Sequence, residues 1–450
     1  MNLLLLLLII HIGLFVLTII ENRGKLISPS SIYFISWIVM LALGFAFSAE
    51  LEITISINTF WIIFISGILF HIVELYFLSI KGKLKRSHTQ QYGTSNAQEI
   101  SLKKAVLWAV LIINIVYLFL ALYSVFSSTG GGSFASRMNV YKTAILFGTS
   151  KVRFQFLIAQ LFKISTALSY VVAYIWIHNY IVAKRKFITN WKYTLIALSY
   201  IVGTFVSQGA RQPAIEFVLY CIVIFISFHL RDVERKKIFN IVKKAIPVVV
   251  LLGVLYYYTM ALAGRSQTPR KLVEYIAANF AGGLYYLNYL VNKTWNKPPY
   301  FGQNSFSEIY KILVTLHLAP QDARITVHEN NRYGNTVTLL GRWYEDFGDI
   351  GVYIMVILVA IFFCWLFYSK LLKKNNSKIH LTRIMYAKLL MSLVWAGYDD
   401  RIRALLAFGS AVQLLLIYLV YLVLIKKKIK LRVGARTTSS YRPIGQGNEN

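Results

Sequence analysis

Apolar runs of about 20 residues recur along the whole chain, and they restrict its possible folds more than any other feature. A helical run of this length spans the roughly 30 Å hydrocarbon core of a lipid bilayer. Because lipid offers no hydrogen-bond partner to the backbone, a spanning segment must satisfy its own N–H and C=O groups, as an α-helix does. The sequence therefore predicts an all-α, polytopic membrane protein.

The runs predict eleven transmembrane helices. They cover residues 3–20, 29–48, 58–79, 105–127, 154–183, 193–210, 212–230, 245–263, 351–369, 382–398 and 405–425. Hydrophobic residues make up 57% of the 450 positions, and the mean hydropathy is +0.57. A water-soluble domain is less apolar than this, so residues 1–450 are predicted to form a single transmembrane domain.

The connections between the runs alternate between strongly and weakly basic. Residues 21–28, 81–104, 184–192, 231–244, 370–380 and 426–450 together contain 29 Lys and Arg and five acidic residues. The alternate set, residues 49–57, 128–153, 211, 264–350 and 399–404, contains 16 Lys and Arg and eleven acidic residues. Basic loops remain cytoplasmic, which predicts an external amino terminus and a cytoplasmic carboxyl terminus. The net charge of +30 then reflects topology, and no nucleic-acid partner is predicted.

Two polar segments and the two cysteines limit other functions. The cytoplasmic loop 81–104 and the tail 426–450 contain few apolar residues and are expected to be mobile. Cys221 and Cys364 lie inside apolar runs, and the eight histidines are scattered singly. The sequence therefore predicts no disulfide, no metal site and no cofactor.

The longest polar connection, residues 264–350, is predicted to be a large external loop. Three amphipathic helical pieces are expected in it: residues 268–291, a piece opening with the capping box Ser305-Phe306-Ser307-Glu308, and residues 335–347, ended by Gly348. Such pieces lie along a membrane surface. The loop is therefore expected to cover the outer ends of the spanning helices.

Ionisable groups gather at the end of this loop. Arg342 precedes Glu345 by three positions and Asp346 by four, so a helix would place all three on one face. The spacing suits a structural salt bridge as well as a catalytic group, since a carboxylate beside an arginine stays ionised and suits a general base less well unless burial raises its pKa. His328 is the other candidate base because histidine titrates near neutral pH, although a lone loop histidine is commonly a surface residue. Further candidates for substrate binding are Arg332, Asn335 and Tyr344.

Other arginines on the predicted external face are candidates for binding an anion. In residues 207–216, SQGARQPAIE, Arg211 precedes a helix start at Pro213, where the helix dipole favours phosphate. An arginine that merely caps the turn is the alternative. Arg265 and Arg270 follow the run 245–263, and Arg401 lies in the last external turn. Anchoring to lipid headgroups is the alternative for such cations.

Few charges lie inside the predicted spans; among them are Glu74, Lys163, Glu216 and Lys388. Intramembrane charge indicates function, and a proton-coupled transporter needs such a relay. His71 and Glu74 lie near the cytoplasmic end of their span, where we expect them to snorkel toward the headgroups.

Two stretches carry a resemblance to a known family. Residues 207–213, SQGARQP, and residues 335–351, NTVTLLGRWYEDFGDIG, together with the many spans and the large late loop, resemble the bacterial O-antigen polymerases of the Wzy type, the oligosaccharide repeat unit polymerases. The resemblance implies a metal-independent, GT-C-like glycosyltransferase on the periplasmic side of the inner membrane. Its implied substrate is an oligosaccharide linked to undecaprenyl pyrophosphate, and its implied products are O-antigen, capsular polysaccharide or exopolysaccharide. Membrane lipids and a chain-length regulator and flippase of the same pathway are the implied partners.

The resemblance also suggests roles for the candidate residues. Arg211 and Arg265 are expected to bind the donor pyrophosphate with help from Arg332 and Arg342, while Asp346, His328 or Glu345 acts on the acceptor hydroxyl. An O-antigen ligase remains an alternative, since it shares the donor and the fold type. A lipid-linked oligosaccharide flippase or transporter is the other alternative, although the internal repeats and broken helices of transporters are not visible in the sequence.

Overall fold

The computed structural model describes residues 2–49, 53–82, 99–147, 152–185, 191–228, 272–293, 298–324, 336–372 and 380–426. Every regular element in these ranges is helical. The helices are α1 (Leu3–Glu21), α2 (Pro29–Ala46), α3 (Ile57–Gly82), α4 (Lys104–Ser128), α5 (Phe134–Phe147), α6 (Gln155–Ile181), α7 (Trp191–Gln208), α8 (Gln212–Phe228), α10 (Leu272–Asn292), α11 (Ser307–Thr315), η3 (Gln321–Ala323), α12 (Leu339–Cys364), η4 (Trp365–Leu371), α13 (Leu381–Val394), α14 (Arg401–Leu405), α15 (Phe408–Tyr421) and η5 (Leu422–Lys426). The predicted all-α class is confirmed for this part of the chain.

Seven of the described helices are long and apolar enough to cross a membrane: α1, α2, α3, α4, α6, α12 with η4, and α15 with η5. Helix α8 is apolar but shorter, and α7 and α13 coincide with two further predicted spans. The predicted span 245–263 lies outside the described residues. The chain is thus a multi-pass membrane protein by the length and composition of its helices, and the number eleven stays a prediction.

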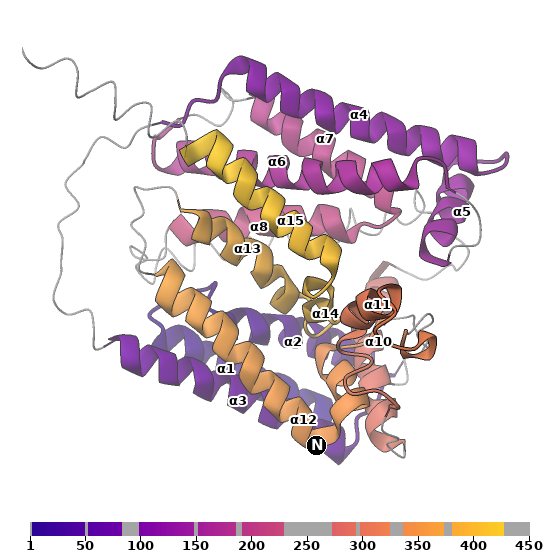
Figure 1. Cartoon of the computed structure of the whole chain (residues 1–450). Helices are drawn as coiled ribbons and strands as arrows, with labels where there is room; N and C mark the ends of the chain where they lie inside the picture. The colour runs from indigo at the N-terminus through magenta and orange to yellow at the C-terminus, as the bar shows by residue number, and fades with distance from the viewer. Residues whose placement is uncertain are drawn as a thin grey trace, which may run out of the picture.

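The long helices form two groups, and α8 and α13 lie between them (Figure 1). In one group α1 packs on α2 and α3, and α12 packs along α3. In the other, α4 packs along α7, and α6 contacts α4, α7 and α15. Helix α13 lies between the groups, touching α2 on one side and α8 on the other. Figure 1 shows α10, α11 and α14 together at one end of this arrangement.

The connections predicted to be cytoplasmic meet at the other end of the helices. The Tyr386 hydroxyl of α13 donates to the carbonyl of Ile27, before α2, at 2.6 Å. The backbone N–H of His380 donates to the Tyr174 hydroxyl, near the end of α6, at 3.1 Å. These bonds bring the loops before α2, after α6 and before α13 to one end, as the alternation of basic loops requires.

Glu74 and His71 in α3 are buried at this end, which corrects the expectation that they snorkel. Glu74 is 3% exposed, and its carboxylate accepts hydrogen bonds from the Ser30 backbone N–H at 2.6 Å and from the Tyr368 hydroxyl at 2.7 Å. His71 lies 3.3 Å from a carboxylate oxygen of Glu21. Because these partners come from neighbouring helices, Glu74 and His71 are paired inside the bundle and do not extend toward the lipid headgroups.

The end that is predicted to be external contains a helix that the sequence analysis did not predict. Helix α5 occupies much of the loop 128–153, and its Met138 and Tyr141 are buried against Val125 and Val206. The apolar spacing of Met138 and Tyr141 follows one helix face, but the surrounding Gly and Ser residues mask this signal in the sequence.

Within residues 264–350, the loop predicted to be external, two predicted boundaries have different outcomes. Helix α11 begins at Ser307 with Phe306 as its N-cap and with no side-chain capping bond, so the predicted capping box is wrong. The predicted helix end at Gly348 is confirmed by a non-helical φ of 62° and ψ of −165° at this residue. After this kink α12 continues into the apolar run.

Candidate functional site

The turn between α13 and α14 lies inside the helical bundle. Backbone hydrogen bonds of 3.0 Å join Leu339 to Ala396 and Asp400 to Val337, and the N–H of Gly397 donates to Ser36 Oγ at 2.8 Å. A Cβ on Gly397 would lie 2.9 Å from the Ser36 carbonyl oxygen, so the close approach requires glycine. Since Ser36 lies well inside α2, the turn between α13 and α14 lies at a level within this helix and not at its end.

Asp346 is surrounded by hydrogen-bond donors from the segment before α11. Its Oδ1 accepts from the backbone N–H and the side-chain amide of Asn304, both at 3.0 Å, and its Oδ2 accepts from the Ser305 N–H at 2.6 Å. The carboxylate is 3% exposed. These three hydrogen bonds hold residues 304–305 against α12. The catalytic role predicted for Asp346 stays a prediction.

Arg342 and Glu345 form the ion pair that their spacing predicts. Arg342 Nη1 lies 3.0 Å from Glu345 Oε2, and the Tyr286 hydroxyl of α10 donates to Glu345 Oε1 at 3.1 Å. Arg342 is 4% exposed and Tyr344 is 8% exposed. The first part of α12 therefore presents its charged face to α10, inside the fold.

Asp400 is a buried carboxylate at the start of α14. It is 2% exposed, and its Oδ1 accepts from the Arg403 backbone N–H at 3.1 Å. In the described part of the chain its Oδ2 has no hydrogen-bond partner. Burial raises the pKa of Asp400 to about 6, and the nearby Arg403 and Arg342 offset part of this effect. The Arg403 side chain in turn donates to Ser307 Oγ at 3.0 Å and to Glu308 at 3.1 Å, which fastens α14 to α11.

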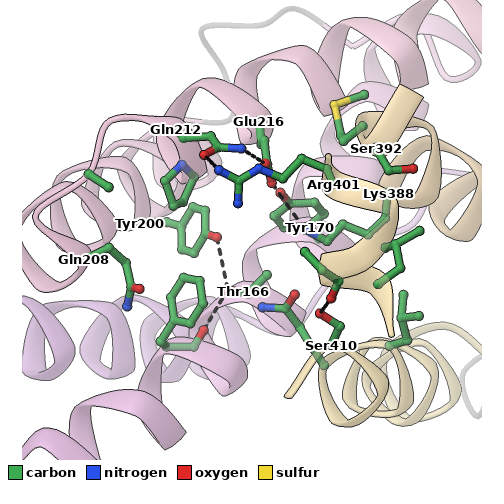
Figure 2. A pocket seen from close by; sticks show the side chains of 18 of the residues that line it. Thr166, Tyr170, Tyr200, Gln208, Gln212, Glu216, Lys388, Ser392, Arg401 and Ser410 are labelled. Carbon is green, nitrogen blue, oxygen red and sulfur yellow. Dashed lines mark hydrogen bonds and ion pairs between the residues drawn. The ribbon is translucent and has the colours of Figure 1, made fainter. Parts of the chain in front are cut away.

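A cavity of about 400 Å³ opens beside α14 (Figure 2). Its walls come from α5, α6, α7, α8, α13, α14 and α15. The polar side chains of the lining include Tyr170, Tyr200, Gln212, Glu216, Lys388 and Arg401. Its volume lies within the range of roughly 300 to 1,000 Å³ that small-molecule sites occupy.

The charged side chains of this cavity form a connected network. Gln212 bridges two of them, because its amide donates to Glu216 Oε1 at 3.0 Å and its Oε1 accepts from Arg401 (Figure 2). Lys388 Nζ lies 3.6 Å from Glu216 Oε2 and 5.1 Å from the centre of the Tyr170 ring. Arg401 also pairs with Asp399 at 2.9 Å.

The predicted site residues fall into three groups. Arg401 lines the cavity, and Arg211, buried at 8% exposure, directly precedes its lining residue Gln212. Arg342, Tyr344, Glu345 and Asp346 lie together in the first part of α12. Arg265, Arg270, His328, Arg332 and Asn335 lie outside the described residues.

Glu216 and Lys388 are cavity residues that the predicted site did not include. Their signal in the sequence was their charge inside apolar runs, but only the folded chain shows that α8 and α13 bring them together. The described residues contain no group of three or more His, Cys, Asp or Glu that could hold a metal ion. The cavity therefore offers one carboxylate, two cations, amides and hydroxyls as its chemical groups.

No protein-family model, curated protein or solved structure matches this chain. Its function is consequently argued from the sequence pattern and from the chemistry of these groups.

Proposed function

We propose that this protein is a membrane glycosyltransferase that joins oligosaccharide repeat units linked to undecaprenyl diphosphate. The observation that carries the proposal is the cavity in which Glu216, Lys388 and Arg401 lie among amides and hydroxyls. Aromatic and polar side chains of this kind suit sugar rings and hydroxyl groups. The apolar helices around the cavity suit a substrate whose lipid tail stays in the membrane.

The reaction requires two kinds of group. A general base takes the proton of the acceptor hydroxyl, and cations stabilise the negative charge that develops on the leaving diphosphate. Arg211, at the start of α8, is the described arginine that we assign to the diphosphate, with Arg265 and Arg332 as candidates outside the described residues. Arg342 is held by Glu345 in this structure, so a direct role for it requires that pair to open.

The proposed location is the periplasmic side of a bacterial inner membrane. The cavity and α11 lie at the end of the helices that carries the less basic connections, which the distribution of Lys and Arg predicts to be external. The proposed products are O-antigen, capsular polysaccharide or exopolysaccharide.

Deletion of the gene tests this function through the material that accumulates. A polymerase predicts surface lipid A that carries single repeats and no long chains. Long chains left on undecaprenyl diphosphate would instead indicate a ligase. Movement of the lipid-linked repeat across liposomes by the purified protein, without elongation, would indicate a flippase and overturn the proposal.

A further inference from the structure

We infer that the cavity beside α14 binds the uncharged sugar of the acceptor that bears the attacking hydroxyl, and that Glu216 takes the proton of this hydroxyl. This inference rests on the proposed glycosyl transfer and assigns one part of the substrate to one part of the site. It places the diphosphate of the donor outside the cavity, at its mouth, where Arg211 precedes Gln212.

The first argument is the balance of charge in the cavity. Arg401 pairs with Asp399 at 2.9 Å, and Lys388 faces Glu216 at 3.6 Å. These four formal charges cancel, so a diphosphate inside the cavity would add negative charge for which the described lining residues leave no cation. Burying an uncompensated charge costs several kcal/mol, whereas a neutral sugar has no such cost.

The second argument is the match between donors and acceptors. A sugar hydroxyl both donates and accepts a hydrogen bond, and the lining offers both functions through Gln208, Gln212, Gln413 and the Tyr200 hydroxyl.

The third argument is that one oxygen of the Glu216 carboxylate can accept a further hydrogen bond. Its Oε1 is held by Gln212 at 3.0 Å, while the ammonium group of Lys388 stays 3.6 Å from Oε2. That distance is longer than a good hydrogen bond, so Oε2 retains room for a hydroxyl proton. Asp346, by contrast, already accepts three hydrogen bonds.

The depth of the cavity fits the geometry of the reaction. The reactive carbon of the donor carries a diphosphate that its lipid tail holds at the membrane surface, so the acceptor hydroxyl must reach the same depth. Glu216 lies one helical turn beyond Gln212, which begins α8 at its outer end. The base is therefore placed just below the level at which the diphosphate is held.

The transfer step balances with the groups named. The acceptor O–H gives its proton to Glu216, and the oxygen forms a bond to the anomeric carbon of the donor sugar. The bond between that carbon and the diphosphate oxygen breaks, and undecaprenyl diphosphate leaves with the electron pair. The proton then passes from Glu216 to solvent at the mouth of the cavity.

The test compares wild type with Glu216→Gln in lipid nanodiscs. Elongation is measured with the lipid-linked repeat unit from membranes of the deletion strain. Binding is measured by native mass spectrometry for that lipid and for undecaprenyl diphosphate, which has no sugar. We expect elongation to fall by about 100-fold, as for loss of a general base, and the affinity for undecaprenyl diphosphate to stay unchanged. The ratio of the affinity for the repeat-unit lipid to the affinity for undecaprenyl diphosphate should fall.

Two results would overturn the inference. If the diphosphate occupied the cavity, removal of the Glu216 charge would tighten the binding of undecaprenyl diphosphate, because a cation would be left uncompensated. Normal elongation by the variant would also refute the role of Glu216. If wild type binds the repeat unit with this Glu216-dependent advantage but never elongates it, the proposed function fails while the sugar subsite stands.

Control variants separate this effect from loss of structure. Glu99→Gln removes a glutamate that pairs with Arg185 at 2.7 Å at the opposite end of the molecule, and it should leave elongation unchanged. The double variant Glu216→Gln with Lys388→Met removes both charges of one pair, which folded proteins commonly tolerate better than a single loss. The double variant should lose elongation as the single variant does. If the single variant does not fold, the elongation activity of the double variant tests the role of Glu216.

Discussion

The carboxylate of Asp346 accepts a 2.6 Å hydrogen bond from the backbone N–H of Ser305. Two further bonds from Asn304, each of 3.0 Å, complete the contact. The residue pair lies 41 positions apart in the sequence, so this one side chain fixes the path of the segment before α11 over the first part of α12. Through Arg403 and Glu308, α11 is in turn joined to α14 beside the cavity.

Asp346→Ala is expected to release this segment. The substitution leaves the N–H groups of Asn304 and Ser305 without their acceptor, and each buried donor left unpaired costs roughly 1–3 kcal/mol. Hydrogen exchange should show faster exchange at these two amides while the α12 amides after Gly348 stay protected. Unchanged protection at both positions would show that Asp346 does not hold the segment.

Asp400→Asn is expected to change the dependence of stability on pH. Burial raises the pKa of Asp400 from 3.8 to about 6, so the folded state binds this proton more tightly than the unfolded state. Its contribution to stability is therefore full below about pH 4 and is lost as the pH rises through about 6. The pKa difference corresponds to roughly 3 kcal/mol.

The variant is neutral at every pH and keeps an oxygen that can accept from the Arg403 N–H. It should melt at a higher temperature than wild type near neutral pH, and the difference should shrink in acid. Scanning fluorimetry across this pH range measures the effect, with the exposed Asp322→Asn as the control. Parallel pH profiles for wild type and Asp400→Asn would contradict the assignment.

Gly348→Ala is expected to destabilise the kink in α12. Gly348 has a φ of 62° and a ψ of −165°, a conformation that side-chain-bearing residues adopt only at a cost of about 1–3 kcal/mol. The melting temperature should fall. Gly13→Ala in α1, where a Cβ would meet no atom within 4 Å, is the matched control and should cause no loss. An equal response of the two variants would refute the requirement for glycine at the kink.

Arg211→Ala is expected to collapse surface polysaccharide to single repeats while the protein still inserts. Arg211 directly precedes α8 after the turn at Gly209, whose φ is 54°, and it is adjacent in the chain to the cavity residue Gln212. Gel analysis of the polysaccharide and immunoblotting of the membranes measure the two effects. Arg185→Ala at the opposite end is the control, and long chains of normal length from Arg211→Ala would exclude a role in donor binding.

Periodicity and charge in the sequence were sufficient for the general architecture. Apolar length predicted the helices α1 to α4, α6 and α15, because a spanning helix must satisfy its own backbone whatever its neighbours are. The kink at Gly348 followed from local rules about glycine. The pairing of Arg342 with Glu345 followed from their spacing on one helix turn.

The cavity could not be predicted in this way. Glu216 and Lys388 are 172 positions apart, and their sequence neighbourhoods show only a charge in an apolar run. Their meeting depends on the packing of α13 against α8, which long-range contacts alone decide. The same holds for Asp346, whose spacing predicts a partner in its own helix but whose donors come from the segment before α11. Local sequence thus determined the long apolar helices and the kink at Gly348, and tertiary packing decided which charges face one another.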